Sequence, residues 1–396
     1  MNRCPLNPIL SAKDVPYDAS LVFNAGVCKW QGEYVMLFRN DHGTTEEQFR
    51  EARAKGGWIH FTTDLGIARS RDGVHWTVGP KPAWSVRDDE VLRVYDPRLT
   101  VVEGRVVLCF AMDTRHGLRG GIATTDDFEH FEVQSLSVPD DRNMAVFPER
   151  IGGRYVRLER PMPVYSRYGT TEAFDIWLSE SPDLRFWGES RLVLGAERVP
   201  YATTKIGPAA PPIRTPKGWL ATIHAVRVVE RELASWEGGW HKEYCAGLML
   251  LDLDDPSKVI GLSREPFIPP VEDYEINGYR GNVIFPGGLI LEDSGEVKIY
   301  SGGAGLYGTK EGLDLYFTDL KEITDATRAE VQEKCTPQDV YEVEYDNYEC
   351  MYDWDGDIRA LGRVLHWFWR EAVLAVQRRG MNMSIDTALE RLEKGE

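Results

Sequence analysis

Six short segments of this 396-residue sequence contain arginine, lysine, asparagine or carboxylate side chains, and three of the six also contain tyrosine or phenylalanine. Each lies at or beside a run of residues typical of a β-strand, which places its polar groups near a strand end. Sugar-binding sites use aromatic rings beside carboxylates and amides, and a carboxyl group can also supply acid–base chemistry. The six segments are Val94–Leu99, Asp113–Arg119, Arg142–Glu149, Arg157–Pro163, Lys205–Pro212 and Tyr279–Gly287.

Other chemistries lack their sequence signatures. The eight histidines are dispersed without a metal-binding pattern, and no phosphate-binding loop, dinucleotide glycine fingerprint or G-x-S-x-G motif occurs. The chain carries 63 acidic and 46 basic residues, a formal charge of −17. Such an acidic chain is a poor partner for nucleic acid or an anionic membrane, because both bind basic surfaces. An anionic ligand would therefore need a local cluster of cations.

Cysteine usage and hydropathy predict a soluble, cytoplasmic protein. The six cysteines are scattered without a C-x-x-C pair, which favours buried free thiols over disulfides or metal ligands. The first residues, MNRCPLNPIL, contain no apolar stretch of signal-peptide length. No apolar run approaches the ~20 residues that a membrane helix needs, so we expect no membrane partner.

The elements that must position the six segments are short strands in a loose repeat. Gly66–Trp76, Gly121–Phe131 and Ile176–Gly188 share an apolar strand, a turn containing aspartate and then an aromatic residue. Gly247–Gly261 and Leu313–Ile323 are weaker copies. Five copies at intervals of roughly 55–70 residues predict an all-β fold, a five-bladed β-propeller, over residues 1–325. An all-β sandwich would contain such strands without this recurrence.

The last part of the chain, residues 326–396, changes its period and forms a separate C-terminal extension in this interpretation. Between Trp354 and Arg379, apolar residues recur at steps of three and four, which predicts an amphipathic α-helix, and Gly380 follows it as a helix stop. Two interpretations stay open. The helix packs against the flank of the propeller, or it forms a subunit contact in a homo-oligomer, because Trp367 and Trp369 enlarge its apolar surface.

Several long motifs in the right order resemble glycoside hydrolase family 130, the mannoside phosphorylases and related hydrolases, over about residues 7–304. The subgroup is similar to the one that includes mannosylglucose phosphorylases. The resemblance implies a five-bladed propeller without a cofactor. It also implies an inverting enzyme that cleaves a β-mannoside with inorganic phosphate to give α-mannose 1-phosphate. The motifs are FNAGVCKWQGEYVMLFRND, RVYDPRL, RNMAVFPERIGGRYVRLERPMP, FDIWLSESPDLRFWG, KIGPAAPPIRTPKGWL and NVIFPGGLILEDSGEVKIY.

The resemblance makes Asp96, in the Tyr-Asp-Pro-Arg motif, the single catalytic acid, with its proton passing through a mannose hydroxyl. Hydrolysis with inversion requires a second carboxylate to activate water, whereas phosphate arrives already anionic. The alternative for Asp96 is a turn-capping aspartate before proline.

A phosphorylase also needs cations for the phosphate, and the resemblance supplies two arginines, a lysine and a histidine. Arg115, Lys205 and His224 match these positions, and Arg142 is favoured as the second arginine over Arg160. Arginine presents a planar fork that fits phosphate oxygens, while lysine adds a compact charge. The alternative is that each forms an ordinary surface ion pair.

Sugar contacts complete the expected site. Asn24 and Arg39 match residues that line the mannose subsite. Four more residues of matched motifs are expected to line the substrate site: Tyr95, Asp175, Tyr279 and Asn282. Asp175 has an alternative as a blade anchor. The chain departs from the family at Gly305, where an aspartate that holds mannose is expected.

Two other functions stay open. An inverting β-mannoside hydrolase on the same scaffold should lack the cation cluster and carry extra carboxylates. A non-catalytic glycan-binding propeller should not need Asp96 for turnover.

Overall fold

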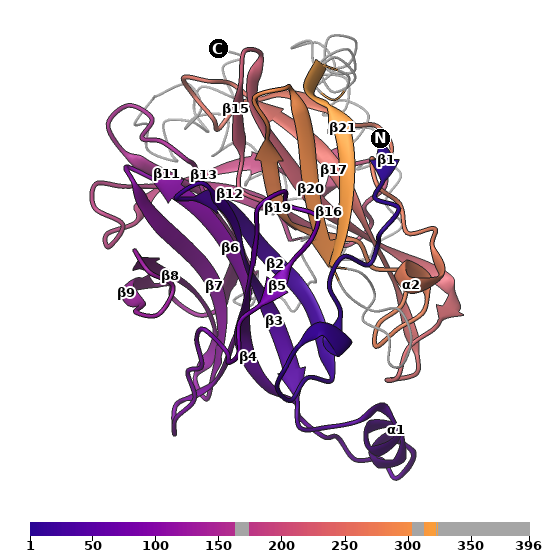
Figure 1. Cartoon of the computed structure of the whole chain (residues 1–396). Helices are drawn as coiled ribbons and strands as arrows, with labels where there is room; N and C mark the ends of the chain where they lie inside the picture. The colour runs from indigo at the N-terminus through magenta and orange to yellow at the C-terminus, as the bar shows by residue number, and fades with distance from the viewer. Residues whose placement is uncertain (163–173, 303–312, 322, 324–396) are drawn as a thin grey trace, which may run out of the picture. The chain divides into compact units, whose positions relative to one another are not determined.

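Five antiparallel sheets make up the part of the chain that the structure, a computed structural model, describes: residues 1–162, 174–302, 313–321 and 323. They are the blades of a β-propeller, and the predicted fold is confirmed (Figure 1). Blade 1 contains β2 (Leu21–Trp30), β3 (Glu33–His42), β4 (Thr62–Ser70) and β5 (Thr77–Val78). Blade 2 contains β6 (Val91–Val102), β7 (Arg105–Thr114), β8 (Gly117–Thr125) and β9 (Glu132–Leu136). Blade 3 contains β10 (Asp141–Val146), β11 (Tyr155–Pro161), β12 (Ile176–Ser181) and β13 (Gly188–Leu194).

The last two blades add small departures from this plan. Blade 4 contains β14 (Lys205–Pro208), β16 (Gly218–Leu233), β17 (Trp240–Leu251) and β18 (Val259–Leu262), with β15 (Ile213–Thr215) also paired to β16. Blade 5 contains β19 (Phe285–Leu291), β20 (Glu296–Gly302), β21 (Leu313–Asp319) and, as its outermost strand, β1 (Asn2–Arg3). The helices are α1 (Glu46–Ala54), α2 (Asp273–Ile276) and two short 3-10 turns, Ala12–Asp14 and Ala196–Arg198.

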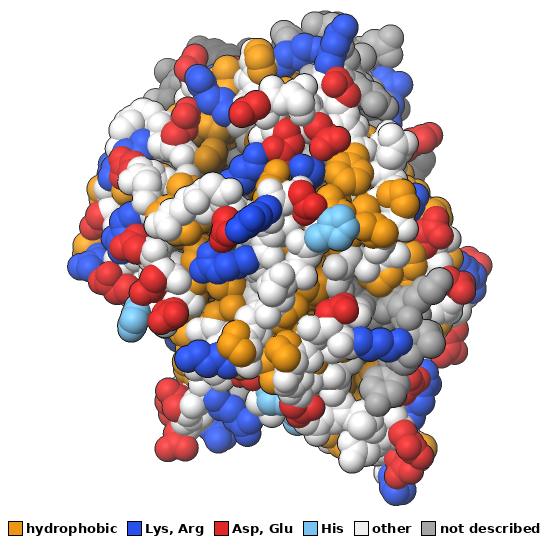
Figure 2. Space-filling view, viewed as in Figure 1, with side chains coloured by type: hydrophobic (Ala, Val, Ile, Leu, Met, Phe, Trp, Pro, Cys, Tyr) orange, Lys and Arg blue, Asp and Glu red, His pale blue; other side chains and the backbone are white. Residues whose placement is uncertain are grey.

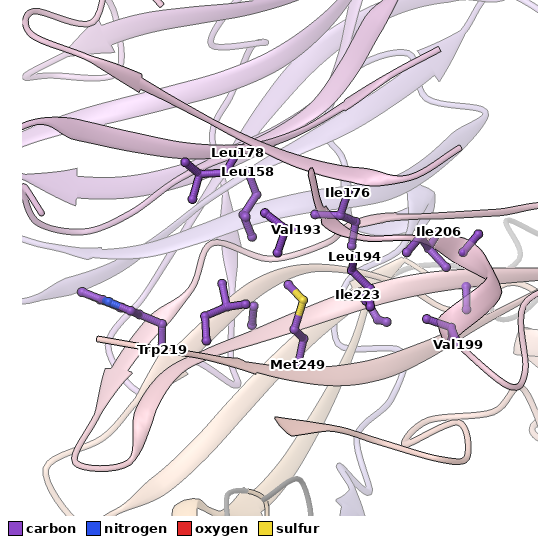
Figure 3. Packing of buried hydrophobic residues seen from close by; sticks show 14 of the residues in the cluster. Leu158, Ile176, Leu178, Val193, Leu194, Val199, Ile206, Trp219, Ile223 and Met249 are labelled. Atoms are coloured by element: carbon purple, nitrogen blue, oxygen red, sulfur yellow. The ribbon is translucent and has the colours of Figure 1, made fainter. Parts of the chain in front are cut away.

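Apolar side chains pack between neighbouring blades, and this packing makes the ring. One buried cluster lies at each of the five blade-to-blade contacts, because strand side chains alternate and each sheet buries both faces against its neighbours. Figure 3 shows the cluster between blades 3 and 4, where Leu158 and Ile176 face Ile223 and Met249. Four buried cysteines are free thiols within the described residues, as expected: Cys4, Cys28, Cys109 and Cys245.

The aspartates of the sequence repeat close the turn between the third and fourth strand of a blade. Asp72, Asp127 and Asp183 each accept two backbone N–H bonds through Oδ1, at 2.8–3.0 Å. A side-chain oxygen that satisfies backbone donors in this way replaces a ladder bond where the chain turns. The repeat in the sequence therefore corresponds to one structural turn in successive blades.

The N-terminal segment closes the ring by completing blade 5. Beyond β1, Asn7 continues the pairing with a side chain: its Oδ1 accepts from Leu315 N at 2.9 Å and its Nδ2 donates to Leu315 O at 3.1 Å. Leu315 is fully buried, so these two backbone groups have no access to water.

Replacing Asn7 with alanine should therefore lower the free energy of unfolding by about 1–3 kcal/mol, the cost of one buried backbone N–H, that of Leu315, left without a partner. Leu315 O would keep a partner, because it also accepts from Cys4 N at 2.9 Å. Urea unfolding followed by fluorescence measures this loss. Leu6→Ala is the matched control, since Leu6 is exposed and its loss should change stability by less than about 0.5 kcal/mol. Equal midpoints for the two variants would remove Asn7 from ring closure.

Several sequence expectations lie outside the described residues. These are the C-terminal extension with its predicted helix, and Gly305. Within the described part, no helix is both long and apolar enough to cross a membrane. Acidic and basic side chains are interspersed on the face that Figure 2 shows.

Candidate active site

A cavity of about 370 Å³ takes side chains from all five blades. The first strand of each blade contributes to it, and these strands contact one another around the axis. Five of the six sequence segments singled out above contribute polar residues to it, among them Asp96, Arg142, Arg160, Lys205 and Tyr279. Such convergence of polar groups and rings is typical of a small-molecule site. The main lining residues are Phe23, Asn24, Arg39, Trp58, His60, Phe61, Arg93, Tyr95, Asp96, Arg142, Asn143, Arg160, Lys205, His224, Trp240, Tyr244, Tyr279, Arg280 and Phe285.

Irregularities in the first strands turn the key side chains into this cavity. Asn24, Asp96 and Asn143 have positive φ angles of 49°, 53° and 59°, and each lies where the strand register shifts. A bulge of this kind bends the strand and re-aims a side chain, and non-glycine residues at positive φ cluster at functional sites. The shared geometry places three equivalent residues of blades 1, 2 and 3 on the cavity wall.

Asp96 is held by two donors from blade 1. Asn24 Nδ2 donates to Asp96 Oδ1 at 2.8 Å, and Arg39 Nη1 lies 3.5 Å from the same oxygen. Arg39 is itself fixed by a two-pronged ion pair with Asp41, at 2.7 and 2.9 Å. Both contacts of Asp96 are made by Oδ1, so a proton on this carboxyl belongs on Oδ2. Among the described residues that line the cavity, Asp96 is the sole carboxylate.

Four cationic or potentially cationic side chains gather on another part of the wall. Arg142 and Arg160 are cross-strand partners in blade 3, while Lys205 and His224 come from blade 4. Arg160 Nη1 lies 3.2 Å from His224 Nε2, and Asn143 Nδ2 lies 3.4 Å from the same nitrogen. We call Arg142, Arg160, Lys205 and His224 the cation cluster.

No carboxylate among the residues that the structure describes forms an ion pair with the cation cluster, although the charges of Asp96 and Asp141 act on Arg142 and Arg160 over longer distances. Four buried nitrogens of the cluster make no hydrogen bond to the described residues: Arg142 Nε, Arg160 Nε, Arg160 Nη2 and His224 Nδ1. Burial first, and then the neighbouring cations, lower the pKa of Lys205 to about 6 and that of Arg160 to about 9, and they lower the pKa of His224. Buried donors and crowded positive charge both favour a bound anion.

Anion binding at the cation cluster should therefore take up a proton. Lys205, with its pKa near 6, is largely neutral at pH 7.5 in the free protein, and a bound anion would raise that pKa. The affinity for sulfate, which does not itself titrate here, should be constant below pH 6 and fall by up to about tenfold per pH unit above it. Calorimetry in buffers of different ionisation enthalpy measures this proton uptake. Lys205→Met should bind sulfate more weakly and without this slope; an unchanged slope would exclude Lys205.

Tyr95 connects the carboxylate side of the cavity to the cation cluster. Its ring contacts two guanidinium groups, those of Arg39 and Arg93, each 4.8 Å from the ring centroid. Its hydroxyl donates to Asp113 Oδ1 at 2.7 Å and receives Arg142 Nη1 at 3.4 Å. Asp113 also accepts from Arg93 Nε at 2.6 Å. The network holds both edges of the cavity in one arrangement.

The structure brings nine of the twelve predicted site residues to the cavity: Asn24, Arg39, Tyr95, Asp96, Arg142, Arg160, Lys205, His224 and Tyr279. Arg115 is not among them, because it lies exposed in the turn between β7 and β8, where its Nε donates to the backbone of Asp89. Asp175 is buried and accepts from Ala196 N at 3.0 Å, in keeping with its alternative as a blade anchor. Asn282 is buried and donates to Ile276 O at 3.3 Å.

Sequence reasoning missed several lining residues. Asn143 directly follows Arg142 in a quoted motif, and only the bulge explains why both face the cavity. Arg93 lies within another quoted motif, two residues before Tyr95 on the same strand face. Trp58 and His60 belong to a connection that has no strand pattern, so nothing in the sequence pointed to them.

Comparison with known proteins agrees with this geometry. The family model of glycoside hydrolase family 130, described as beta-1,4-mannooligosaccharide phosphorylase, matches residues 9–328. The chain belongs to glycoside hydrolase family 130. The predicted family is thus confirmed, and so is the prediction of a carbohydrate-active enzyme.

Several proteins similar to this chain are named as phosphorylases. The beta-1,4-mannooligosaccharide phosphorylase of Ruminococcus albus is 30% identical over 341 residues, 83% of this chain and 90% of the relative. The 4-O-beta-D-mannosyl-D-glucose phosphorylase of Bacteroides fragilis is 27% identical over 309 residues, 74% of this chain and 72% of the relative. The solved beta-1,2-mannobiose phosphorylase of Listeria innocua, in complex with beta-1,2-mannobiose, superimposes with a TM-score of 0.69 at 28% identity. That match covers 83% of this chain and all of the other.

Proposed function

We propose that the protein is an inverting phosphorylase that cleaves a short β-mannoside with inorganic phosphate and releases α-mannose 1-phosphate. The observation that carries the proposal is the composition of the cavity wall. One carboxylate, Asp96, faces it among the described residues, together with a cation cluster that forms no ion pair there. Phosphorolysis requires these two features, one acid for the leaving sugar and a group of cations for phosphate.

The proposed roles follow from the geometry. Asn24 and Arg39 hold Asp96 Oδ1, which leaves the acidic proton on Oδ2 to pass through a mannose hydroxyl to the glycosidic oxygen of the leaving sugar. The cation cluster binds phosphate through the buried nitrogens of Arg142, Arg160 and His224 and the ammonium group of Lys205. Phosphate displaces the leaving sugar with inversion at the anomeric carbon. Arg115 has no part in this proposal, since its side chain lies outside the cavity.

An inverting hydrolase fits the same wall less well. It would need a second carboxylate, roughly 6.5–9.5 Å from the acid, to activate water. Asp96 is the sole carboxylate among the described lining residues, and the cavity wall instead contains several cations. Cations would also disfavour the proton transfer that a base must accept.

For the leaving sugar we propose glucose, because the motifs resemble the mannosylglucose phosphorylases and one relative carries that name. The reverse reaction tests activity and sugar together: purified protein is incubated with mannose 1-phosphate and glucose, mannose or N-acetylglucosamine in turn. Phosphate release with glucose, and a disaccharide product, is the expected result. Release with mannose alone would retain the phosphorylase and change the substrate. No release with any acceptor, together with hydrolysis of β-mannosides in phosphate-free buffer, would overturn the proposal.

A further inference from the structure

The connection between β3 and β4, residues 43–61, is long where the corresponding connection in blade 2 is a two-residue turn. We call it the β3–β4 insertion. It contains α1, which begins at a capping box in which Thr45 and Gln48 exchange backbone-to-side-chain hydrogen bonds. Figure 1 shows α1 beyond the ends of β3 and β4. An insertion of this length in a compact blade is typical of a functional loop.

One side chain, Phe49, anchors the β3–β4 insertion to another part of the ring. Its side chain is fully buried. The ring stacks on Phe61 at 5.8 Å, meets Tyr279 edge-on at 5.5 Å and lies 6.2 Å from Trp236. Trp236 precedes β17 of blade 4, and Tyr279 precedes β19 of blade 5. A segment of blade 1 is therefore held against segments of blades 4 and 5 by aromatic packing.

The C-terminal end of the β3–β4 insertion then presents two side chains to the cavity. Trp58 and His60 both line it. Trp58 touches Phe49 edge-on at 5.2 Å, yet 43% of its surface is exposed, unlike the buried rings that anchor the insertion. An exposed indole on a fixed cavity wall offers a flat apolar surface to a ligand.

A continuous series of ring contacts connects the cation cluster to this indole. Lys205 Nζ lies 5.0 Å from the Tyr244 ring, which stacks on Trp240 at 6.1 Å. Arg280 then bridges Trp240 and Tyr279, at 5.1 and 5.4 Å. Tyr279 meets Phe61 at 5.7 Å, and Phe61 leads to Phe49 and Trp58. Lys205 is therefore the first group of this series and Trp58 is the last, and both line the cavity.

In an inverting reaction the two ends of this wall would bind different groups. The nucleophile and the leaving group lie on opposite faces of the anomeric carbon. If phosphate occupies the cation cluster, as the proposed function requires, the leaving sugar extends toward the other end of the wall.

We propose that Trp58 and His60 of the β3–β4 insertion form the platform that binds the leaving sugar and selects it. The inference rests on the proposed function. The Trp58 indole stacks on the apolar C–H face of the pyranose, and the His60 imidazole hydrogen-bonds one of its hydroxyls. The phosphate and the mannosyl unit are held elsewhere, by the cation cluster and by Asn24 and Arg39.

The test compares Trp58→Ala and His60→Ala with wild type in both directions. Trp58→Ala should raise the KM for the acceptor sugar by about ten- to a hundredfold, with the KM for phosphate within about twofold of wild type. Trp58→Phe should recover part of the loss, and His60→Ala should change the order of preference among glucose, mannose and N-acetylglucosamine. Phe186→Ala is the matched control, because Phe186 is 74% exposed, lies in a turn of blade 3 and does not line the cavity.

Unchanged acceptor KM and unchanged preference in both alanine variants would overturn the inference, as would an equal rise in the KM for phosphate. A binding measurement, which needs no turnover, distinguishes failure of this inference from failure of the proposed function. Saturation-transfer NMR with glucose and with mannose should show sugar contacts in wild type and in Phe186→Ala and weaker contacts in Trp58→Ala, whether or not turnover occurs. Equal contacts in all three proteins would reject the platform.

Discussion

Replacing Asp96 by asparagine should lower kcat for phosphorolysis by about 10²–10⁴-fold and leave the fold intact. Asparagine keeps the size of the side chain and an oxygen that can still accept from Asn24, so the local bulge has no reason to change. What it removes is the proton that the leaving sugar needs. Steady-state rates at saturating mannoside and phosphate measure the loss, and thermal unfolding checks the fold.

Asp126→Asn provides the matched control for this substitution. Asp126 follows β8 of the same blade, forms an exposed ion pair with Arg105 at 3.2 Å and does not line the cavity. Its loss should leave kcat unchanged, since exposed ion pairs contribute little. Activity of Asp96→Asn within about threefold of wild type would exclude Asp96 as the general acid.

The second large effect concerns the cation cluster. Arg160→Ala should raise the KM for phosphate by about a hundredfold or more, because each hydrogen bond to a charged group is worth roughly 1.5–3 kcal/mol and a guanidinium makes two. Arg160 is 1% exposed, and two of its nitrogens have no partner among the described residues, so phosphate is the partner that they would lose. Initial rates over a phosphate titration, at fixed mannoside, give the KM.

Arg115→Ala is the informative contrast to Arg160→Ala. Resemblance alone placed Arg115 in the phosphate site, whereas the geometry leaves it exposed in the β7–β8 turn. The phosphate KM of Arg115→Ala should stay within about twofold of wild type. A hundredfold rise in Arg115→Ala, with Arg160→Ala unaffected, would reverse the assignment. Arg160→Lys, which keeps a charge without the planar fork, should lie between alanine and wild type and controls for loss of buried packing.

The fold was predictable because its repeat is local. Blades 1, 2 and 3 each end their third strand in a turn closed by an aspartate, and that turn recurs in the sequence with the same residue types. Ring closure was not predictable. β1 has two residues and no period, and its pairing with β21 joins residues more than 300 positions apart. Helix α1 was missed too, although Thr45 and Gln48 form a recognisable capping pair.

The types of residue in the site were predictable from the sequence, but which individual residues line the cavity was less so. Asp96 and Lys205 lie within quoted motifs and His224 lies four residues after one, and all three side chains line the cavity. Choosing between Arg115, Arg142 and Arg160 required three-dimensional information. Arg142 and Arg160 are 18 positions apart and face each other across a ladder, whereas Arg115 lies at a hairpin turn that points its side chain outward. Spacing along the chain does not distinguish these cases, because strand pairing determines which side chains meet.

The most direct test of the proposed phosphorylase activity is to identify the products formed from mannosylglucose, with and without inorganic phosphate. Mannobiose serves as a second substrate. ³¹P and ¹H NMR of the same reaction detect mannose 1-phosphate, its anomeric configuration and free mannose together. We expect the rate of cleavage to rise with the phosphate concentration until it saturates. We also expect one α-mannose 1-phosphate to form for each sugar released. Free mannose formed at the same rate in phosphate-free buffer would contradict the proposed activity.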